Sequence, residues 1–191
     1  RKITFEEILP KLKPKHVVLH DLFDGDSASQ WEDKQASRRA YKSRRQLDSI
    51  ERELNLLIDE LKWMRKHMPE ATLHVIASNH NEFLRRCIEE LRWVRDDTNL
   101  AIGAKIIDAL QEDMNTRGLQ AFELSPMDPV NWWIDIRNLP GVKTHSRRSK
   151  LILPEGRGVK KILLSLHGDI GSRGQKAGSL IAFRKWNHWI I

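Results

Sequence analysis

Apolar positions recur along the chain with two spacings, and the spacing predicts which segments are helices and which are strands. From about Gln30 to His67 they return every three or four residues, as on one face of an α-helix, and Pro69 ends the pattern. The part before Leu47 lacks this stripe, so we predict that this basic half projects from the core or bends away from it. The stripe consists of Leu47, Ile50, Leu54, Leu57, Ile58, Leu61 and Met64.

Other segments carry the same helical period. Helices are predicted over 5–13 and 177–185, and another begins at about Asn81. A further helix is predicted from Thr98, which is a favourable N-cap, to Gly118, which is a natural stop. The expected core-facing residues of the two central helices are Leu84, Cys87, Ile88 and Leu91, then Ile102, Ile106, Ile107, Leu110 and Met114.

Short apolar runs predict strands. They cover 16–19, 71–77, 151–153 and 162–166, with a turn over 154–158 and the beginning of another strand at 189–191. Residues 119–150 contain three prolines and the pair Trp132-Trp133, and predict an irregular segment with short pieces of strand or helix. The alternation of strands and helices predicts a layered α/β fold in a single domain.

Composition narrows the class of protein. The 191 residues, 40% hydrophobic and 31% charged, are typical of a soluble globular domain, and no apolar run approaches the roughly 20 residues that span a bilayer. The single cysteine, Cys87, excludes an intramolecular disulfide and fits a reducing compartment such as the cytoplasm. We interpret it as a buried thiol, and the seven tryptophans as packing residues.

The net charge of +7 indicates a polyanionic partner, and the basic residues form two blocks. Two solvated faces would explain the blocks equally well, whereas a groove for nucleic acid fits better beside a phosphoester-cleaving site. The loop at 171–174 adds backbone amides and Arg173, which suit phosphate. The blocks are Arg38, Arg39, Lys42, Arg44 and Arg45, then Lys143, Arg147, Arg148, Lys150, Arg157, Lys160 and Lys161.

Three of the apolar runs end in residues that bind metals or transfer protons. Ligand sites of α/β proteins lie beyond the carboxyl ends of strands, so three such ends together predict a metal-dependent hydrolytic site. Each end also has a simpler interpretation: Asp24 and Asp26 as turn residues, Asn79 as part of a helix cap, and His167 as a locally hydrogen-bonded side chain. The ends are His20-Asp21-Leu22-Phe23-Asp24, Asn79-His80-Asn81-Glu82 and His167-Gly168-Asp169.

In order, these three ends resemble the second, third and fourth motifs of the calcineurin-like metallophosphoesterase superfamily. The motifs are Gly-Asp-x-x-Asp, Gly-Asn-His-(Asp/Glu) and a strand-end His; here His20 and Ser78 replace the glycines, and Asn81 replaces the acid. The amino-acid sequence of these segments is most similar to that of phage-encoded DNases that degrade host DNA. The resemblance implies a metallophosphoesterase-type β-sandwich flanked by helices, with a long basic helical insertion at about 30–68 and, if phage-encoded, action in the host cytoplasm.

The resemblance also implies roles for individual residues. Asp21 would bridge two divalent ions, Asn79 and His167 would bind the second ion, and His80 would assist in-line attack of a metal-bridging hydroxide on DNA. Mn²⁺ is expected, with Mg²⁺, Zn²⁺ and Fe²⁺ as alternatives. We expect the phosphates of the nucleic acid to contact Arg173, Arg38, Arg39, Arg147 and Arg148.

The first and last motifs of the family, Asp-x-His and Gly-His-x-His, do not occur in these residues. We therefore expect the chain to be part of a longer enzyme. Two alternatives stay open: a metallophosphatase for a phosphoprotein or small phosphoester, and a catalytically silent nucleic-acid-binding or assembly module. No membrane partner is expected, and the sequence leaves open whether the protein forms a homo-oligomer.

Overall fold

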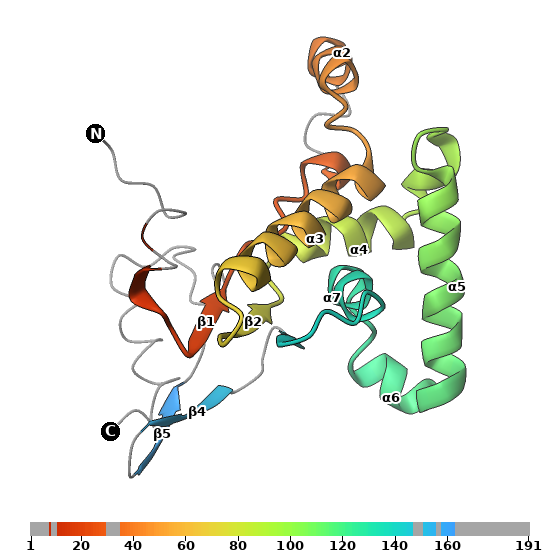
Figure 1. Cartoon of the computed structure of the whole chain (residues 1–191). Helices are drawn as coiled ribbons and strands as arrows, with labels where there is room; N and C mark the ends of the chain where they lie inside the picture. The colour runs from red at the N-terminus through yellow and green to blue at the C-terminus, as the bar shows by residue number, and fades with distance from the viewer. Residues whose placement is uncertain (1–7, 9–10, 30–34, 147–150, 156–157, 163–191) are drawn as a thin grey trace, which may run out of the picture.

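The computed structural model describes residues 8, 11–29, 35–146, 151–155 and 158–162, which form a mixed α/β fold (Figure 1). The elements are β1 (His16–Leu19), the 3₁₀ turn η1 (Asp26–Ala28), α2 (Ala36–Arg45), α3 (Ile50–His67), β2 (Thr72–Ile76), α4 (Asn81–Glu89), η2 (Arg92–Arg95), α5 (Leu100–Arg117), α6 (Leu119–Leu124), α7 (Pro129–Asp135), β3 (Val142–His145), β4 (Leu151–Glu155) and β5 (Gly158–Ile162).

The strands β1, β2 and β3 form a parallel sheet with β2 in the centre. Leu19 is paired with Val75, and Ile76 with His145, so all three strands end at the same edge. The predicted strands at 16–19 and 71–77 are confirmed, with Thr72–Ile76 as the bounds of the second. Residues 73–77 are all buried, as expected for a central parallel strand covered on both faces.

One face of the sheet is continuous with the hydrophobic core. Alternate residues of β1 and β2 point to this face, where they join the buried stripes of the helices. Trp133 is fully buried there, and Trp63, Trp93 and Trp132 pack against the cluster, which confirms the prediction that these four are packing residues. The fully buried members include Ile50, Leu54, Leu61, Leu73, Leu84, Ile88, Ile106 and Ile134.

The single helical segment expected at 30–67 is wrong in one respect, because it is two helices. α2 ends at Gln46, whose φ of 54° is left-handed, and α3 starts after the N-cap Ser49, whose side chain accepts a hydrogen bond from Arg52 N. Figure 1 shows α2 standing away from the other helices, at the end of the molecule opposite the β4–β5 hairpin. The predicted departure of the basic half from the core is therefore confirmed. Leu47, predicted as the first residue of the apolar stripe, is 37% exposed and lies between the two helices, so the buried stripe begins at Ile50.

The next two helices lie where the pattern predicts them, with two corrections. Leu91, expected in the core, is 57% exposed because the chain leaves the helix there with a left-handed φ of 54°. Asn99 rather than Thr98 occupies the N-cap position of α5. The Asn99 side chain instead accepts a hydrogen bond from Ile50 N at 2.8 Å, so it caps α3 from a distant part of the chain. Gly118 ends α5 as predicted.

The segment 119–150 contains α6, α7 and the third strand of the sheet, which agrees with the expectation of short elements. The following hairpin differs from the prediction, because its second strand is Gly158–Ile162 rather than 162–166. Residues 163–166 and the elements predicted at 177–185 and 189–191 lie outside the described residues, as does most of the helix predicted at 5–13.

The described strands form a three-stranded sheet and a two-stranded hairpin, without the second packed sheet of a sandwich. None of the described helices has the length and apolar character needed to cross a membrane.

Candidate functional site

The candidate site lies at the carboxyl edge of the parallel sheet, where the chain leaves β1 and β2. Because the strands are parallel neighbours, the segment after Leu19 and the segment after Ile76 begin at the same edge. Asp21 follows the first strand and Asn79 and His80 follow the second, and all three are partly buried. The structure thus brings two of the three predicted strand ends together.

The loop after β1 bends back over the start of α4. Asp21 has a left-handed φ of 51°, which turns the chain directly after the strand. Gly25, with φ of 78°, lies so close to Phe83 and to His80 O that a Cβ there would be 2.8 Å from the Phe83 ring. The loop can approach this closely only because residue 25 has no side chain. As a result, Asp24 Oδ1 lies 3.5 Å from Nδ1 of His80.

The carboxylate of Glu53, on α3, holds the same loop from the other side. It accepts hydrogen bonds from Gly25 N at 2.6 Å, Asp26 N at 3.3 Å and Ser27 N at 3.0 Å, and also from the Ser27 hydroxyl. A carboxylate that accepts several backbone N–H groups makes charge-assisted bonds, which are stronger than neutral ones. Glu53 therefore fixes the position of the loop that carries Asp21 and Asp24.

The edge contains buried polar atoms that the described residues leave without a hydrogen bond. Asn79 Oδ1 and His20 Nδ1 are inaccessible to solvent and have no hydrogen-bond partner in the described part of the chain. Leaving such an atom unpaired costs about 1–3 kcal/mol, so a ligand at the edge would compensate for it. An amide oxygen next to a carboxylate suits a hard divalent cation. Asp21 and Asn79, which follow neighbouring strands, carry oxygen atoms of the kind that such a cation binds.

Asn81, at the position of the acid in the family motif, has a structural role. Its Oδ1 accepts a hydrogen bond from the Ser78 hydroxyl at 3.2 Å, and its Nδ2 donates to both carboxylate oxygens of Asp128, at 3.0 and 3.1 Å. Asp128 is the N-cap of α7 and also accepts from Val130 N and Asn131 N. Burial raises the pKa of the Asp128 carboxyl, against the opposing effect of these hydrogen bonds. This network fixes the junction between β2 and α4, and with it His80.

A second group of histidines lies across the sheet. His16 Nδ1 is 3.1 Å from His74 Nε2, and His74 Nδ1 is 3.0 Å from His145 Nε2, so three rings from three strands form one hydrogen-bonded chain. Burial, followed by the neighbouring His145 and His16 and by Lys143, lowers the pKa of His74 to about 4. His145 ends β3 and is partly buried, although it stands in a basic part of the sequence. Burial also lowers the pKa of His145.

The remaining predicted site residues have different outcomes. Arg38 is exposed on α2, and Arg39 belongs to the same helix. His167, Arg173, Arg147 and Arg148 lie outside the described residues. Within the described ranges, no three His, Cys, Asp or Glu side chains come close enough to hold a metal ion.

Three residues of the site were not predicted from the sequence. Asp24 was interpreted as a turn residue, yet its carboxylate faces His80. Glu53 lies in the long helical pattern, where nothing distinguishes it from a solvated charged residue. His20 stands at the place of a motif glycine, and the sequence assigns it no role of its own. The spacing Asp21-x-x-Asp24 was the one local signal for the second carboxylate.

Comparison of the chain with protein-family models, curated proteins and solved structures gave no match. The resemblance of the strand ends to metallophosphoesterase motifs therefore remains a prediction from those residues.

Proposed function

We propose that this chain belongs to a divalent-metal-dependent phosphodiesterase that hydrolyses DNA, with a metallophosphoesterase-type β-sandwich. The observation that carries the proposal is the meeting of the loops after β1 and β2, with Asp24 Oδ1 3.5 Å from His80 Nδ1. Asp21 and Asn79 lie at the same edge, and Asn79 Oδ1 is buried without a hydrogen-bond partner among the described residues.

In this proposal each residue has a role. Asp21 and Asn79 would hold the cation, together with His167 by the resemblance to the family. A bound divalent ion supplies Lewis-acid activation of water and charge neutralisation at phosphorus. His80 would donate a proton to the leaving oxygen, with the exposed Asp24 carboxylate 3.5 Å from its ring nitrogen. Glu53 and the Asn81–Asp128 network hold the two loops in place at this edge of the sheet.

The positive charge of the protein supports a nucleic-acid substrate over a small phosphoester. A net charge of +7 attracts polyanions over a long range, whereas a small phosphate ester needs only local contacts. If an aryl phosphate is turned over better than DNA, the metallophosphatase alternative is the better assignment.

The test compares His80→Ala with His67→Ala, a matched change at an exposed histidine at the end of α3. Mn²⁺-dependent cleavage of plasmid DNA should fall about 10²–10⁴-fold in His80→Ala, the usual contribution of a general acid. It should be unchanged in His67→Ala, and both variants should bind Mn²⁺ as the wild type does by calorimetry. Equal cleavage in the two variants would disprove the role of His80. DNA binding without any metal-activated cleavage would favour the silent nucleic-acid-binding module.

A further inference from the structure

The helix α2 has an unusual charge for its length. Its ten residues, ASRRAYKSRR, include Arg38, Arg39, Lys42, Arg44 and Arg45 and no acidic residue, which is a formal charge of +5. Basic residues in the last turn are favourable to the helix dipole, but like charges three or four positions apart on one helix repel each other.

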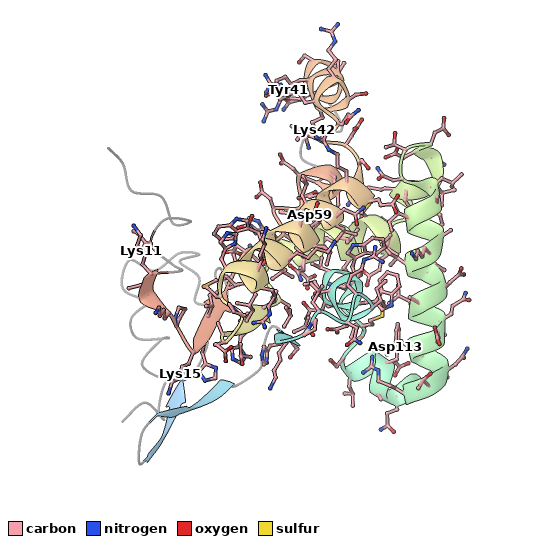
Figure 2. All side chains as sticks on the ribbon, in the orientation of Figure 1. Lys11, Lys15, Tyr41, Lys42, Asp59 and Asp113 are labelled. Carbon is pink, nitrogen blue, oxygen red and sulfur yellow. The ribbon has the colours of Figure 1, made fainter. Side chains whose placement is uncertain are left out.

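Little of α2 is buried. Apart from Lys42, every side chain described in α2 is exposed, including Tyr41 at 47%. Figure 2, where Tyr41 and Lys42 are labelled, shows the helix at the periphery of the molecule. A helix of ten residues is marginal in isolation, so contacts at its base must hold it in place.

Two cations form that base. Lys42 is 8% exposed, and its ammonium donates to Asp26 O at 2.7 Å. Arg52 Nη1, from α3, donates to the carbonyl oxygens of Arg45 at 2.9 Å and Gln46 at 3.0 Å, and so caps the carboxyl end of α2. Asp26 belongs to the loop that also carries Asp24. The helix is therefore attached to the same loop as the strand-end site.

The exposed side of α2 has the chemistry of a phosphate-binding surface. Arg38, Tyr41 and Arg45 are three and four positions apart and share one face, with the Arg45 guanidinium 5.2 Å from the centre of the Tyr41 ring. Guanidinium groups bind phosphate oxygens in pairs, and they keep their charge at every physiological pH. Only one large apolar side chain lies on this face, so it is suited to a polyanion rather than to a lipid surface.

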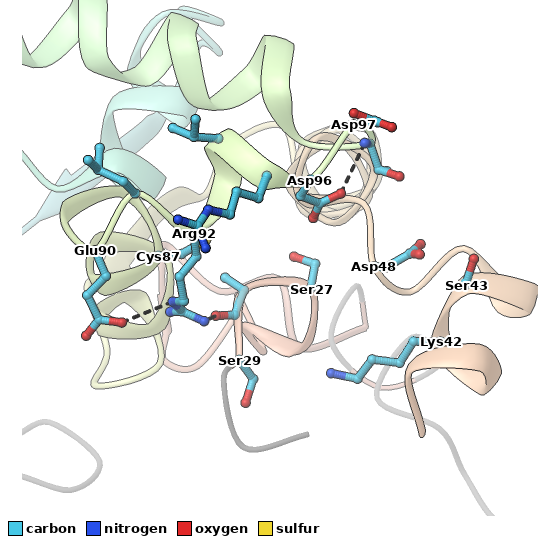
Figure 3. Close-up of a pocket in the computed structure, with 15 residues that line it drawn as sticks. Ser27, Ser29, Lys42, Ser43, Asp48, Cys87, Glu90, Arg92, Asp96 and Asp97 are labelled. Carbon is cyan, nitrogen blue, oxygen red and sulfur yellow. Dashed lines mark hydrogen bonds and ion pairs between the residues drawn. The ribbon is translucent and has the colours of Figure 1, made fainter. Parts of the chain in front are cut away.

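The cavity beside α2 has a different character. It measures about 1100 Å³ and lies between η1, α2 and η2 (Figure 3). Arg92, in its wall, already donates to Ala28 O and pairs with Glu90, so this guanidinium is occupied within the protein. A polyanion would therefore bind on the outer face of the helix, not in the cavity. The charged residues lining the cavity are Lys42, Arg92 and Arg95 against Asp48, Glu90, Asp96 and Asp97.

We propose that α2 is a DNA-binding arm of the strand-end site, which holds the backbone phosphates of duplex DNA beside the loop carrying Asp21 and Asp24. This inference rests on the proposed function for its substrate. When phosphates bind to the arginines, their negative charges neutralise the repulsion between the guanidinium groups. The helix therefore becomes more stable in the complex. The attachment through Lys42 keeps the bound DNA at a constant distance from the loop.

The test measures duplex DNA affinity over a range of NaCl concentrations, with EDTA present so that no metal-dependent cleavage occurs. The triple variant Arg38→Gln, Arg44→Gln, Arg45→Gln is compared with the wild type. Each phosphate contact contributes about 0.9 to the slope of log K against log salt, so the slope should become less negative by up to about 2.7.

A matched control variant carries the same change of charge at three exposed residues on other elements. Lys62→Gln, Lys66→Gln, Arg86→Gln should leave the slope close to that of the wild type. An unchanged slope in the α2 variant, or an equal change in both variants, would overturn the inference. Circular dichroism melting confirms that both variants are folded.

The outcome is separable from that of the proposed function. Loss of the α2 effect with intact Mn²⁺-dependent cleavage disproves the arm alone. If the α2 variant changes the salt slope as expected but no metal supports cleavage, the proposed enzyme is disproved. DNA binding by α2 is then still supported.

Discussion

The buried histidine chain predicts a specific loss of stability in acid. His74 is 4% exposed, and both of its ring nitrogens lie within hydrogen-bonding distance of another histidine, at 3.1 and 3.0 Å. A neutral imidazole donates one hydrogen bond and accepts one, whereas a protonated imidazole can only donate. Protonation of His74 therefore disturbs one of the two contacts, and it places a charge near Lys143. These effects agree with the lowering of its pKa to about 4.

The sign and size follow from the difference between the folded and unfolded states. The pKa of His74 is 6.5 in the unfolded chain and about 4 in the fold, so the unfolded chain binds more protons between these values. Stability is complete above pH about 6.5 and falls as the pH decreases towards about 4. Linkage over this interval gives a loss of about 2 kcal/mol between pH 7 and pH 5, since each unit corresponds to about 1.4 kcal/mol. The lowered pKa of His145 acts in the same direction.

The assay is urea unfolding at pH 7, 6 and 5 for the wild type and His74→Phe, which keeps a ring of similar shape. The free energy of unfolding of the wild type should decrease by about 2 kcal/mol more than that of the variant over this range. The absolute free energy of unfolding of the variant does not affect the test, because only its change with pH is compared with that of the wild type. His67→Phe, at an exposed position, should behave as the wild type does. Parallel pH profiles for the wild type and His74→Phe would refute the reasoning.

Two further substitutions test contacts that stabilise the fold, one beside the site and one between α5 and η2. Asp128→Ala removes the N-cap of α7 and leaves Asn81 Nδ2 unpaired, so thermal unfolding should show a loss of about 2–4 kcal/mol; a loss below about 1 kcal/mol would contradict the network. Gly103→Ala places a methyl group against the Trp93 ring, and urea unfolding should show a loss of about 1–3 kcal/mol. Ala104→Ser, one residue along on the exposed side of α5, should change stability by less than about 0.5 kcal/mol; equal effects of the two changes would exclude overpacking.

The sequence by itself determined the elements whose signal is local. The strand at 16–19, the central strand and the stripes of α3, α4 and α5 were predicted, because apolar periodicity within one segment decides which face can be buried. The departure of the basic α2 from the core followed from the same pattern, since residues before Leu47 have no apolar face to bury. The candidate residues Asp21, Asn79 and His80 were also visible as polar residues at strand ends.

Only the tertiary structure decided the contacts between segments far apart in the chain. The break at Gln46, the capping of α3 by Asn99 and the place of β3 beside β2 depend on which segments meet in three dimensions. The histidine chain joins residues 58 and 71 positions apart, so no local pattern contains it. The approach of Asp24 to His80 likewise needs the parallel pairing of β1 with β2 and the close packing at Gly25. Local periodicity selects the elements, and the burial of their apolar faces against one another brings the polar groups of the site together.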